Sequence, residues 1–248
     1  FNAKVSSHRV FDGVAFPLAE VRAIKDRIEG GTVNDVILTI IGGGLRRYLE
    51  QRGELPADSL TAMAPISVRA EGEKKAMGNL VSMVVALGTH IADPMERLDH
   101  VHREAANSKA LTNAVGARTL TDYSQLIPSG LAGLGARLYT RLGVANAHAP
   151  VFNVVATNVP GSRVPLYFVG AQMVKMMGLG PIFDSMGLIN TIYSYGDEIA
   201  ISFTSDRAMM PDPDVYADAL RAAFAELKAA AGAESKPARK KKAAARKR

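Results

Sequence analysis

The chain has 248 residues, 48% of them hydrophobic, and is long enough to bury one large core or two small ones. It contains no cysteine, which excludes disulfides, thiolate metal sites and a cysteine nucleophile, and makes the cytoplasm the expected compartment. The net charge of +6 comes from residues 236–248, which carry eight Lys or Arg and no acid, while residues 1–235 hold 22 basic and 24 acidic side chains. These last residues form a basic tail that is expected to be solvated or attracted to phosphate-rich surfaces.

Neither a transmembrane span nor a secretory signal is visible. The most apolar stretch, residues 164–195, is interrupted by Lys175, Asp184 and several Gly and Pro, and no uninterrupted run reaches the roughly 18 apolar residues that span a bilayer. The sequence begins at Phe1, without an initiator Met, in a polar stretch typical of the middle of a protein. We therefore expect a fragment or a processed chain that does not span a membrane.

Two helices are predicted in the first fifty residues. Apolar residues recur at helical spacing over residues 17–29, which predicts a surface helix ended by a Gly-Gly pair. Thr32 begins the second helix, over residues 33–51, and Asp35 three residues later completes a capping box. The first half of this second helix is apolar on nearly all sides, so we expect it to be buried.

The middle of the chain predicts two strands and then helical structure. Residues 59–69 and 79–88 have strand character, and the second stretch is so continuously apolar that we place it in the centre of a sheet covered on both faces. Residues 94–111 form an amphipathic helix, and residues 111–148 lean towards helix with Gly interruptions.

The last third predicts four strands rich in Val, Ile, Tyr and Phe, followed by a closing amphipathic helix over residues 214–231. A tight hairpin at Gly196 and Asp197 joins the last two strands. The fold class is therefore α/β (α+β), with a mixed sheet flanked by helices. The four predicted strands cover residues 150–159, 166–176, 187–196 and 198–206.

Histidines are the obvious candidates for acid–base chemistry, but they do not cluster. His100 and His102 lie two residues apart on a helix, about 200° around its axis, so they cannot share a ligand and are interpreted as solvated. His90 and His148 stand alone in loops, and no metal-ligand spacing is present.

Two further motifs have an ordinary structural interpretation beside a functional one. The stretch "SSHRVFDG" places His8 four residues before Asp12, the spacing of the second histidine and the aspartate in the HHxxxDG motif of acyl-transferring enzymes. The glycines of "IGGGLRR", residues 42–44, lie beside two arginines as in a phosphate cradle, but they fall inside a helical pattern. We therefore interpret these glycines as sites of close helix packing.

Five phrases occur in fixed order along the chain: "TVNDVILTIIGGGLRRYL", "PISVR", "GNLVSMVVALGTHIADPMERL", "ATNVPGSRVPLYFVGA" and "SYGDEIAISFTSDRAMMPD". Together they resemble the C-terminal half of bacterial wax ester synthase/diacylglycerol acyltransferases, from Phe1 to about Ala230. That family resembles chloramphenicol acetyltransferase in fold, which implies two α/β halves that meet along a channel.

The resemblance also explains the HHxxxDG spacing. In the family this motif belongs to an N-terminal half, well over a hundred residues before the ND phrase, whereas Asp12 lies only 22 residues before Asn34. We therefore interpret "SHRVFDG" as an accident of spacing, with the catalytic histidine on another half. The implied division is the end of an interdomain linker and a first strand (1–16), a C-terminal acyltransferase domain (17–231) and a basic tail (232–248).

The implied activity is transfer of a fatty acyl group from acyl-CoA, a substrate and not a permanent cofactor, to diacylglycerol or a long-chain alcohol. The partner is the N-terminal half carrying HHxxxDG, whose histidine acts as general base. By position in the matching phrases, active-site support falls to Asn34, Asp35 and Ser67, and the substrate channel to Arg69, Thr157 and Asn158.

Each of these assignments has a structural alternative. Asn34 and Asp35 equally suit a purely structural role, capping a helix and holding the halves together, and Ser67 and Arg69 suit stabilisation of a strand end. The apolar residues of "MVKMMGLGPIF", residues 173–183, suit either an acyl tunnel or, preferably, simple core packing.

Two other functions remain open at this point. The first is a non-catalytic lipid-binding or lipid-droplet module; residues 236–248 then dock on an anionic surface, and the protein is cytoplasmic and peripheral to membranes or droplets. The second, a nucleic-acid-binding protein, rests on the tail alone, and no specific nucleic acid is expected because no aromatic residue lies among the cations. An extensive exposed apolar face favours the acyltransferase half, and a wholly polar surface favours the binding module.

Overall fold

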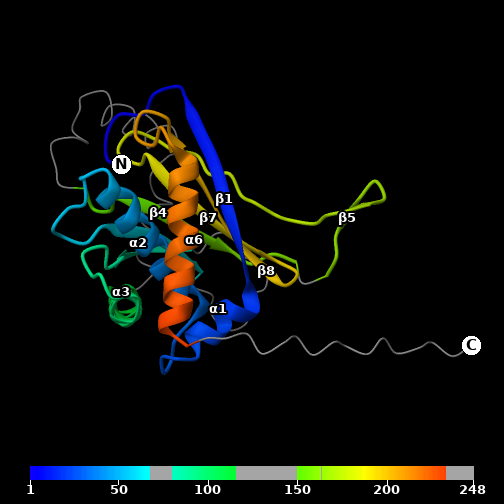
Figure 1. Cartoon of the computed structure of the whole chain (residues 1–248), viewed down its shortest axis with the longest axis horizontal. Helices are drawn as coiled ribbons and strands as arrows, with labels where there is room; N and C mark the ends of the chain where they lie inside the picture. The colour runs from blue at the N-terminus through cyan, green and yellow to red at the C-terminus, as the bar shows by residue number, and fades with distance from the viewer. Residues whose placement is uncertain (68–79, 116–149, 163, 233–248) are drawn as a thin grey trace, which may run out of the picture.

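The computed structural model describes residues 1–67, 80–115, 150–162 and 164–232, and in this part of the chain a six-stranded mixed sheet forms the centre (Figure 1). The strand order is β1-β8-β7-β4-β2-β3. β4 pairs in parallel with both β2 and β7, and the other neighbours are antiparallel. The strands are β1 (Arg9–Pro17), β2 (Thr61–Ser67), β3 (Leu80–Ala86), β4 (Val154–Val159), β7 (Leu188–Tyr195) and β8 (Glu198–Asp206).

A layer of helices covers one face of this sheet, as Figure 1 shows. The main core lies between the helices and the sheet and takes Leu188 and Ile192 from β7. The helices are α1 (Leu18–Lys25), α2 (Val33–Gln51), α3 (Pro94–Val115) and α6 (Pro213–Ala230). The mixed sheet flanked by helices confirms the predicted fold class.

The opposite face of the sheet is covered differently. Ile189, which alternates with the core residues of β7, joins Val155 and Ile182 in a small second cluster. The chain returning from β4 to β7 crosses this face closely, since side chains of β7 leave no room for a Cβ at Gly178 or Gly180.

α2 follows the sequence prediction in both bounds and packing. Its capping box is present, with Asp35 Oδ2 accepting from the backbone amide of Thr32 at 2.9 Å and Thr32 Oγ1 accepting from the amide of Asp35 at 3.1 Å. A Cβ on Gly42 would overlap the carbonyl oxygen of Leu87, so this glycine serves the predicted close packing. By contrast, α1 ends at Lys25, four residues earlier than predicted, because turns follow it.

β3 does not lie in the centre of the sheet, so that prediction was wrong. In the described part of the chain it is a terminal strand and pairs with β2. Met83 and Val85 are buried while Val84 is half-buried, and α3 packs on the strand. The apolar run therefore reflects a strand beneath a helix and not one between two strands.

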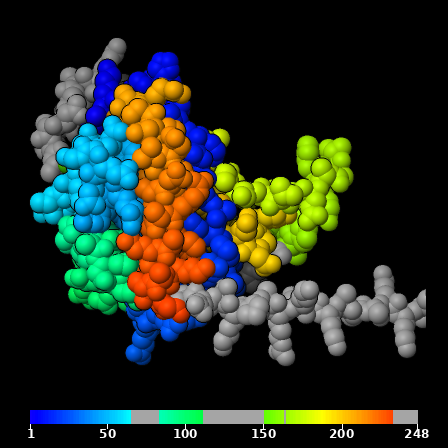
Figure 2. Space-filling view, viewed as in Figure 1, coloured from blue at the N-terminus to red at the C-terminus, as the bar shows by residue number. Residues whose placement is uncertain are grey.

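The prediction of one continuous strand over residues 166–176 is also wrong. The segment forms a separate hairpin of β5 (Tyr167–Phe168) and β6 (Ala171–Gln172), turned by Val169 and Gly170, which have φ of +49° and +83°. We call residues 164–179 the arm; it projects from the body of the molecule in Figures 1 and 2. By contrast, the predicted hairpin between β7 and β8 is confirmed.

Asp206, at the end of β8, anchors the first residues of the chain. The side chain is fully buried and accepts hydrogen bonds from the amide of Ser6 at 2.5 Å, from Ser6 Oγ at 2.7 Å and from the amide of Ala208 at 2.8 Å. Burial alone would raise the pKa of Asp206, but these hydrogen bonds and the charge of Arg9, 3.6 Å away, outweigh it and hold the pKa below its usual value.

We expect Asp206→Asn to lower the free energy of unfolding at pH 7 by about 1–3 kcal/mol, because an amide cannot accept all of these hydrogen bonds. The folded pKa lies below the unfolded one of about 3.9, so the carboxylate's contribution is complete above that value and is lost as the pH falls through the folded pKa. Urea unfolding between pH 3 and 7 measures this. The gap between wild type and variant should narrow below about pH 4.

Asp218→Asn is the matched control, because Asp218 is an exposed carboxylate paired with Arg221 on the surface. It should change stability by less than about 0.5 kcal/mol. Equal losses in the two variants would contradict the anchoring role of Asp206.

Candidate functional site

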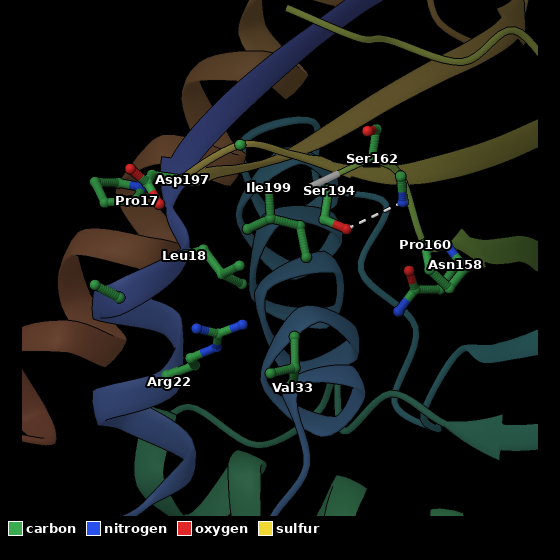
Figure 3. Close-up of a pocket in the computed structure, with 13 residues that line it drawn as sticks. Pro17, Leu18, Arg22, Val33, Asn158, Pro160, Ser162, Ser194, Asp197 and Ile199 are labelled. Carbon is green, nitrogen blue, oxygen red and sulfur yellow. Dashed lines mark hydrogen bonds between the residues drawn. The ribbon is translucent and has the colours of Figure 1, made fainter. Parts of the chain in front are cut away.

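A cavity of about 670 Å³ opens where β4 and β7 end (Figure 3). Its walls come from the junction of β1 and α1, from the first residue of α2, from the residues after β4 and from the turn between β7 and β8. A volume of this size lies within the range of small-molecule sites. The lining residues are Pro17, Leu18, Ala19, Arg22, Val33, Asn158, Pro160, Gly161, Ser162, Ser194, Gly196, Asp197 and Ile199.

The cavity combines an apolar wall with a few polar groups. Leu18, Val33 and Ile199 provide the apolar wall; in Figure 3 Val33 and Ile199 lie between Arg22 and the polar turn after β4, and Leu18 lies beside Arg22. That turn is held by Ser194, whose Oγ accepts a hydrogen bond from the amide of Gly161 at 3.2 Å. This arrangement suits an amphipathic ligand.

Arg22 is a residue of this cavity that the sequence did not single out. It lies on the exposed side of α1, and within the described residues its side chain makes no ion pair and no hydrogen bond. In sequence it is one of several charged residues on the polar face of a surface helix. Only the tertiary position distinguishes it from its neighbours.

Of the predicted channel residues, Asn158 lines the cavity. Thr157, its neighbour in β4, pairs in register with Thr191 and is not among the lining residues. Ser67 is the last residue of β2, but its side chain lies outside the described part of the structure, as does the whole of Arg69.

The two residues of the ND phrase have different surroundings in the structure. Asp35 is 4% exposed, completes the capping box and has its Oδ2 2.8 Å from Nδ1 of His102 on α3. Asn34 directly follows Val33 of the cavity wall, is half-buried, and has no side-chain hydrogen bond within the described residues. Asp35 is therefore committed to holding α2, whereas the amide of Asn34 is free.

The remaining histidines give no catalytic cluster. His102 is not solvated as predicted, because it pairs with Asp35, while the His100 ring packs edge-on against His90 with centroids 5.6 Å apart. His8 is exposed before β1, and His148 lies outside the described residues. Among the residues with described positions, no three His, Asp or Glu side chains are grouped to hold a metal ion.

The model of the family described as "WS/DGAT C-terminal domain" matches residues 77–228, more than half of the chain. The chain belongs to this family. The predicted resemblance is thereby confirmed for the C-terminal domain.

Relatives of this WS/DGAT C-terminal domain are longer proteins. Two from Mycobacterium tuberculosis, provisionally named diacylglycerol O-acyltransferases, are 34% identical over 232 residues and 30% identical over 227 residues. The alignments cover 93% and 92% of this chain but 50% and 45% of those proteins. The chain thus spans about half the length of the relatives it matches.

Solved structures with a similar fold include longer chains. The wax ester synthase/diacylglycerol acyltransferase from Marinobacter aquaeolei VT8 superposes with a TM-score of 0.70 at 27% identity, covering 93% of this chain and 51% of that one. The epimerization domain from the third module of tyrocidine synthetase B gives a TM-score of 0.50 at 11% identity, which shows a shared fold alone.

The two residues of the ND phrase make a matched pair for mutation in this WS/DGAT C-terminal domain. We expect Asp35→Ala to lower the free energy of unfolding by about 1–2 kcal/mol, because α2 loses its capping box and His102 loses its partner. Asn34→Ala should stay within about 0.5 kcal/mol of wild type. Urea unfolding of both variants measures the difference, and an equal loss would show that Asn34 is also structural.

Proposed function

We propose that this chain is the C-terminal half of an O-acyltransferase that moves a fatty acyl group from acyl-CoA to diacylglycerol or a long-chain alcohol. Its membership in the WS/DGAT C-terminal domain family carries the proposal. This chain covers about half of its relatives, which supports a second half, and we propose that this N-terminal half carries the HHxxxDG motif. We assign no permanent cofactor to the chain.

In this mechanism the histidine of the N-terminal half removes the proton of the acceptor hydroxyl as general base. The alkoxide oxygen attacks the thioester carbonyl, a tetrahedral oxyanion forms, and its collapse breaks the carbon–sulfur bond and releases CoA as the thiol. Hydrogen-bond donors aimed at the oxyanion stabilise the transition state by about 3 kcal/mol each. The side-chain amide of Asn34, which has no partner within the described residues, is the donor that we assign to this chain, and Asn158 lines the substrate channel.

The arm supports assembly with another half. Tyr167, Phe168 and Val169 are 65%, 82% and 91% exposed, and Val174 is 85% exposed. Monomeric proteins rarely expose such contiguous apolar surface without an interaction partner. We assign the missing N-terminal half as the partner, because this chain spans about half of its relatives.

The exposed arm also weighs against the alternative functions. A free-standing lipid-binding module calls for a polar surface, and core packing or a closed acyl tunnel for residues 173–183 calls for buried side chains. Leu179 and Phe183 are instead 72% and 57% exposed, whereas Ile182 is buried in the second cluster. The prediction that these residues simply pack in the core is therefore confirmed for Ile182 and wrong for Leu179 and Phe183.

The proposed location is the cytoplasm, peripheral to membranes or lipid droplets. Among the residues that the structure describes, no helix has both the length and the apolar character needed to cross a bilayer. We propose that residues 236–248, which lie outside the described residues, bind an anionic lipid surface through their charges.

The first test is thiol release from palmitoyl-CoA with hexadecanol or diacylglycerol as acceptor. We expect activity when the chain is combined with the polypeptide encoded immediately upstream, and none with the chain alone. In the combination, Asn34→Ala should lower turnover roughly a hundredfold, as the loss of an oxyanion donor does. Asn107→Ala, an exposed position on α3, is the matched control and should leave turnover unchanged.

Two results would contradict this proposal. Activity of the chain alone would place the base here, with His8 the first residue to mutate. No acyl transfer in the combination, with the two halves shown to be bound, would leave the non-catalytic binding module as the better interpretation.

A second test concerns the arm. We expect Phe168→Glu to weaken binding of the chain to the purified upstream half at least about tenfold, because association would bury an unpaired charge. Val151→Glu is the matched control, since Val151 is 76% exposed but lies outside the arm. Titration by calorimetry measures both affinities, and equal effects would exclude the arm from the interface.

A further inference from the structure

Arg22 differs from the cations around it. Lys25 pairs with Asp26 at 2.5 Å, and Lys228 pairs with Glu20 on α1 at 2.9 Å. Arg27 donates to the carbonyl oxygen of Gly232 at 2.9 Å. Arg22 alone among these four has no partner within the described residues, and Figure 3 shows its guanidinium beside the cavity.

The surroundings of Arg22 suit one anionic group on an otherwise uncharged ligand. The cavity wall next to it is apolar, with Leu18 and Val33, and on the far side the hydroxyl of Ser162 donates to the carbonyl oxygen of Val164 at 2.8 Å. The other charged lining residue, Asp197, lies beside Pro17 in Figure 3 and makes no ion pair with Arg22 in the described part of the chain. The guanidinium is therefore free to make paired hydrogen bonds with an incoming oxyanion.

The chemistry of the proposed substrates limits what that oxyanion is. In an acyl thioester the fatty acid's carboxyl group is neutral, and both acceptors, diacylglycerol and a fatty alcohol, are neutral as well. The phosphate groups of CoA are then the only negative charges that the substrates bring. We propose that Arg22 binds a phosphate group of acyl-CoA and that the cavity between α1, α2 and the turn after β4 holds part of the CoA moiety. This inference rests on the proposed function and names the place of CoA within it.

The probe is CoA itself, titrated calorimetrically into the chain. Pantetheine, the part of CoA that carries no phosphate, and palmitate, a free carboxylate, are the comparison ligands. We expect CoA to bind measurably and pantetheine at least about tenfold more weakly. Arg22→Gln should weaken CoA binding about tenfold or more, the scale of one lost charge-assisted interaction, and leave pantetheine unchanged. The substitution is on an exposed helical position and Gln is a good helix former, so the variant should fold, which circular dichroism checks.

Arg27→Gln is the matched control. It removes the same charge five residues away, from a side chain that does not line the cavity, and should change CoA affinity less than twofold. If both variants weakened CoA binding equally, the loss would come from the overall positive charge of this surface and not from a contact with Arg22, which would overturn the proposed site. So would equal binding of CoA and pantetheine, Arg22-dependent binding of palmitate alone, or no CoA binding by the chain.

The outcome is separable from that of the acyl-transfer assay. Phosphate-dependent CoA binding through Arg22 without acyl transfer would keep the subsite and remove the proposed reaction. Acyl transfer with an unchanged KM for palmitoyl-CoA in Arg22→Gln would keep the reaction and remove the subsite.

Discussion

The close approach of α2 to its neighbours is the constraint on which the rest of the structure depends. Three successive glycines make this approach: a Cβ on Gly42 would overlap the carbonyl oxygen of Leu87, and one on Gly43 or Gly44 would meet side chains of α3 and α6. The helix is buried along most of its length. Its position fixes where its first turn lies, and that turn carries Val33 of the cavity wall and the free amide of Asn34.

Stability and function are divided between neighbouring residues in that turn. Asp35 accepts a hydrogen bond from the amide of Thr32 and also contacts His102 on α3, so it joins two helices. A carboxylate with these contacts is poorly placed to act on a substrate. Asn34, one residue earlier, has no such commitment in the described part of the chain, and for that reason it is the better candidate for a role in chemistry.

What the sequence predicted well was local. Helical periodicity, the capping box of Thr32 and Asp35, and the β7–β8 hairpin all depend on residues close together in the chain. What it missed depends on distant contacts: β3 looks like a central strand because its apolar run packs beneath α3, and residues 166–176 include β-forming side chains that stay exposed in the described part of the chain. An apolar strand pattern predicts that the strand will be buried, but it does not predict which element will cover it.

The same limit applies to the candidate site. Asn158 was predictable because a polar residue ends an otherwise buried strand. Arg22 was not, because its distinguishing property emerges only in the fold: Lys25, Arg27 and, from α6, Lys228 have partners, and Arg22 has none within the described residues. Residue spacing in the sequence does not predict which charged side chain on the polar face of a helix will remain unpaired after folding.

The arm shows how a half-domain can expose apolar surface without losing its shape. At its base the amide of Gly178 donates to Ser202 Oγ at 3.0 Å, and its carbonyl oxygen accepts from Thr191 Oγ1 at 2.7 Å, both buried hydroxyls of the main sheet. At its tip Phe168 and Val169 are almost fully exposed. Because the base is already held by the main sheet, less conformational entropy would oppose association in the proposed assembly. A segment fixed at its base and apolar at its tip suits an interface with a second half, whereas a solvated loop would need neither feature.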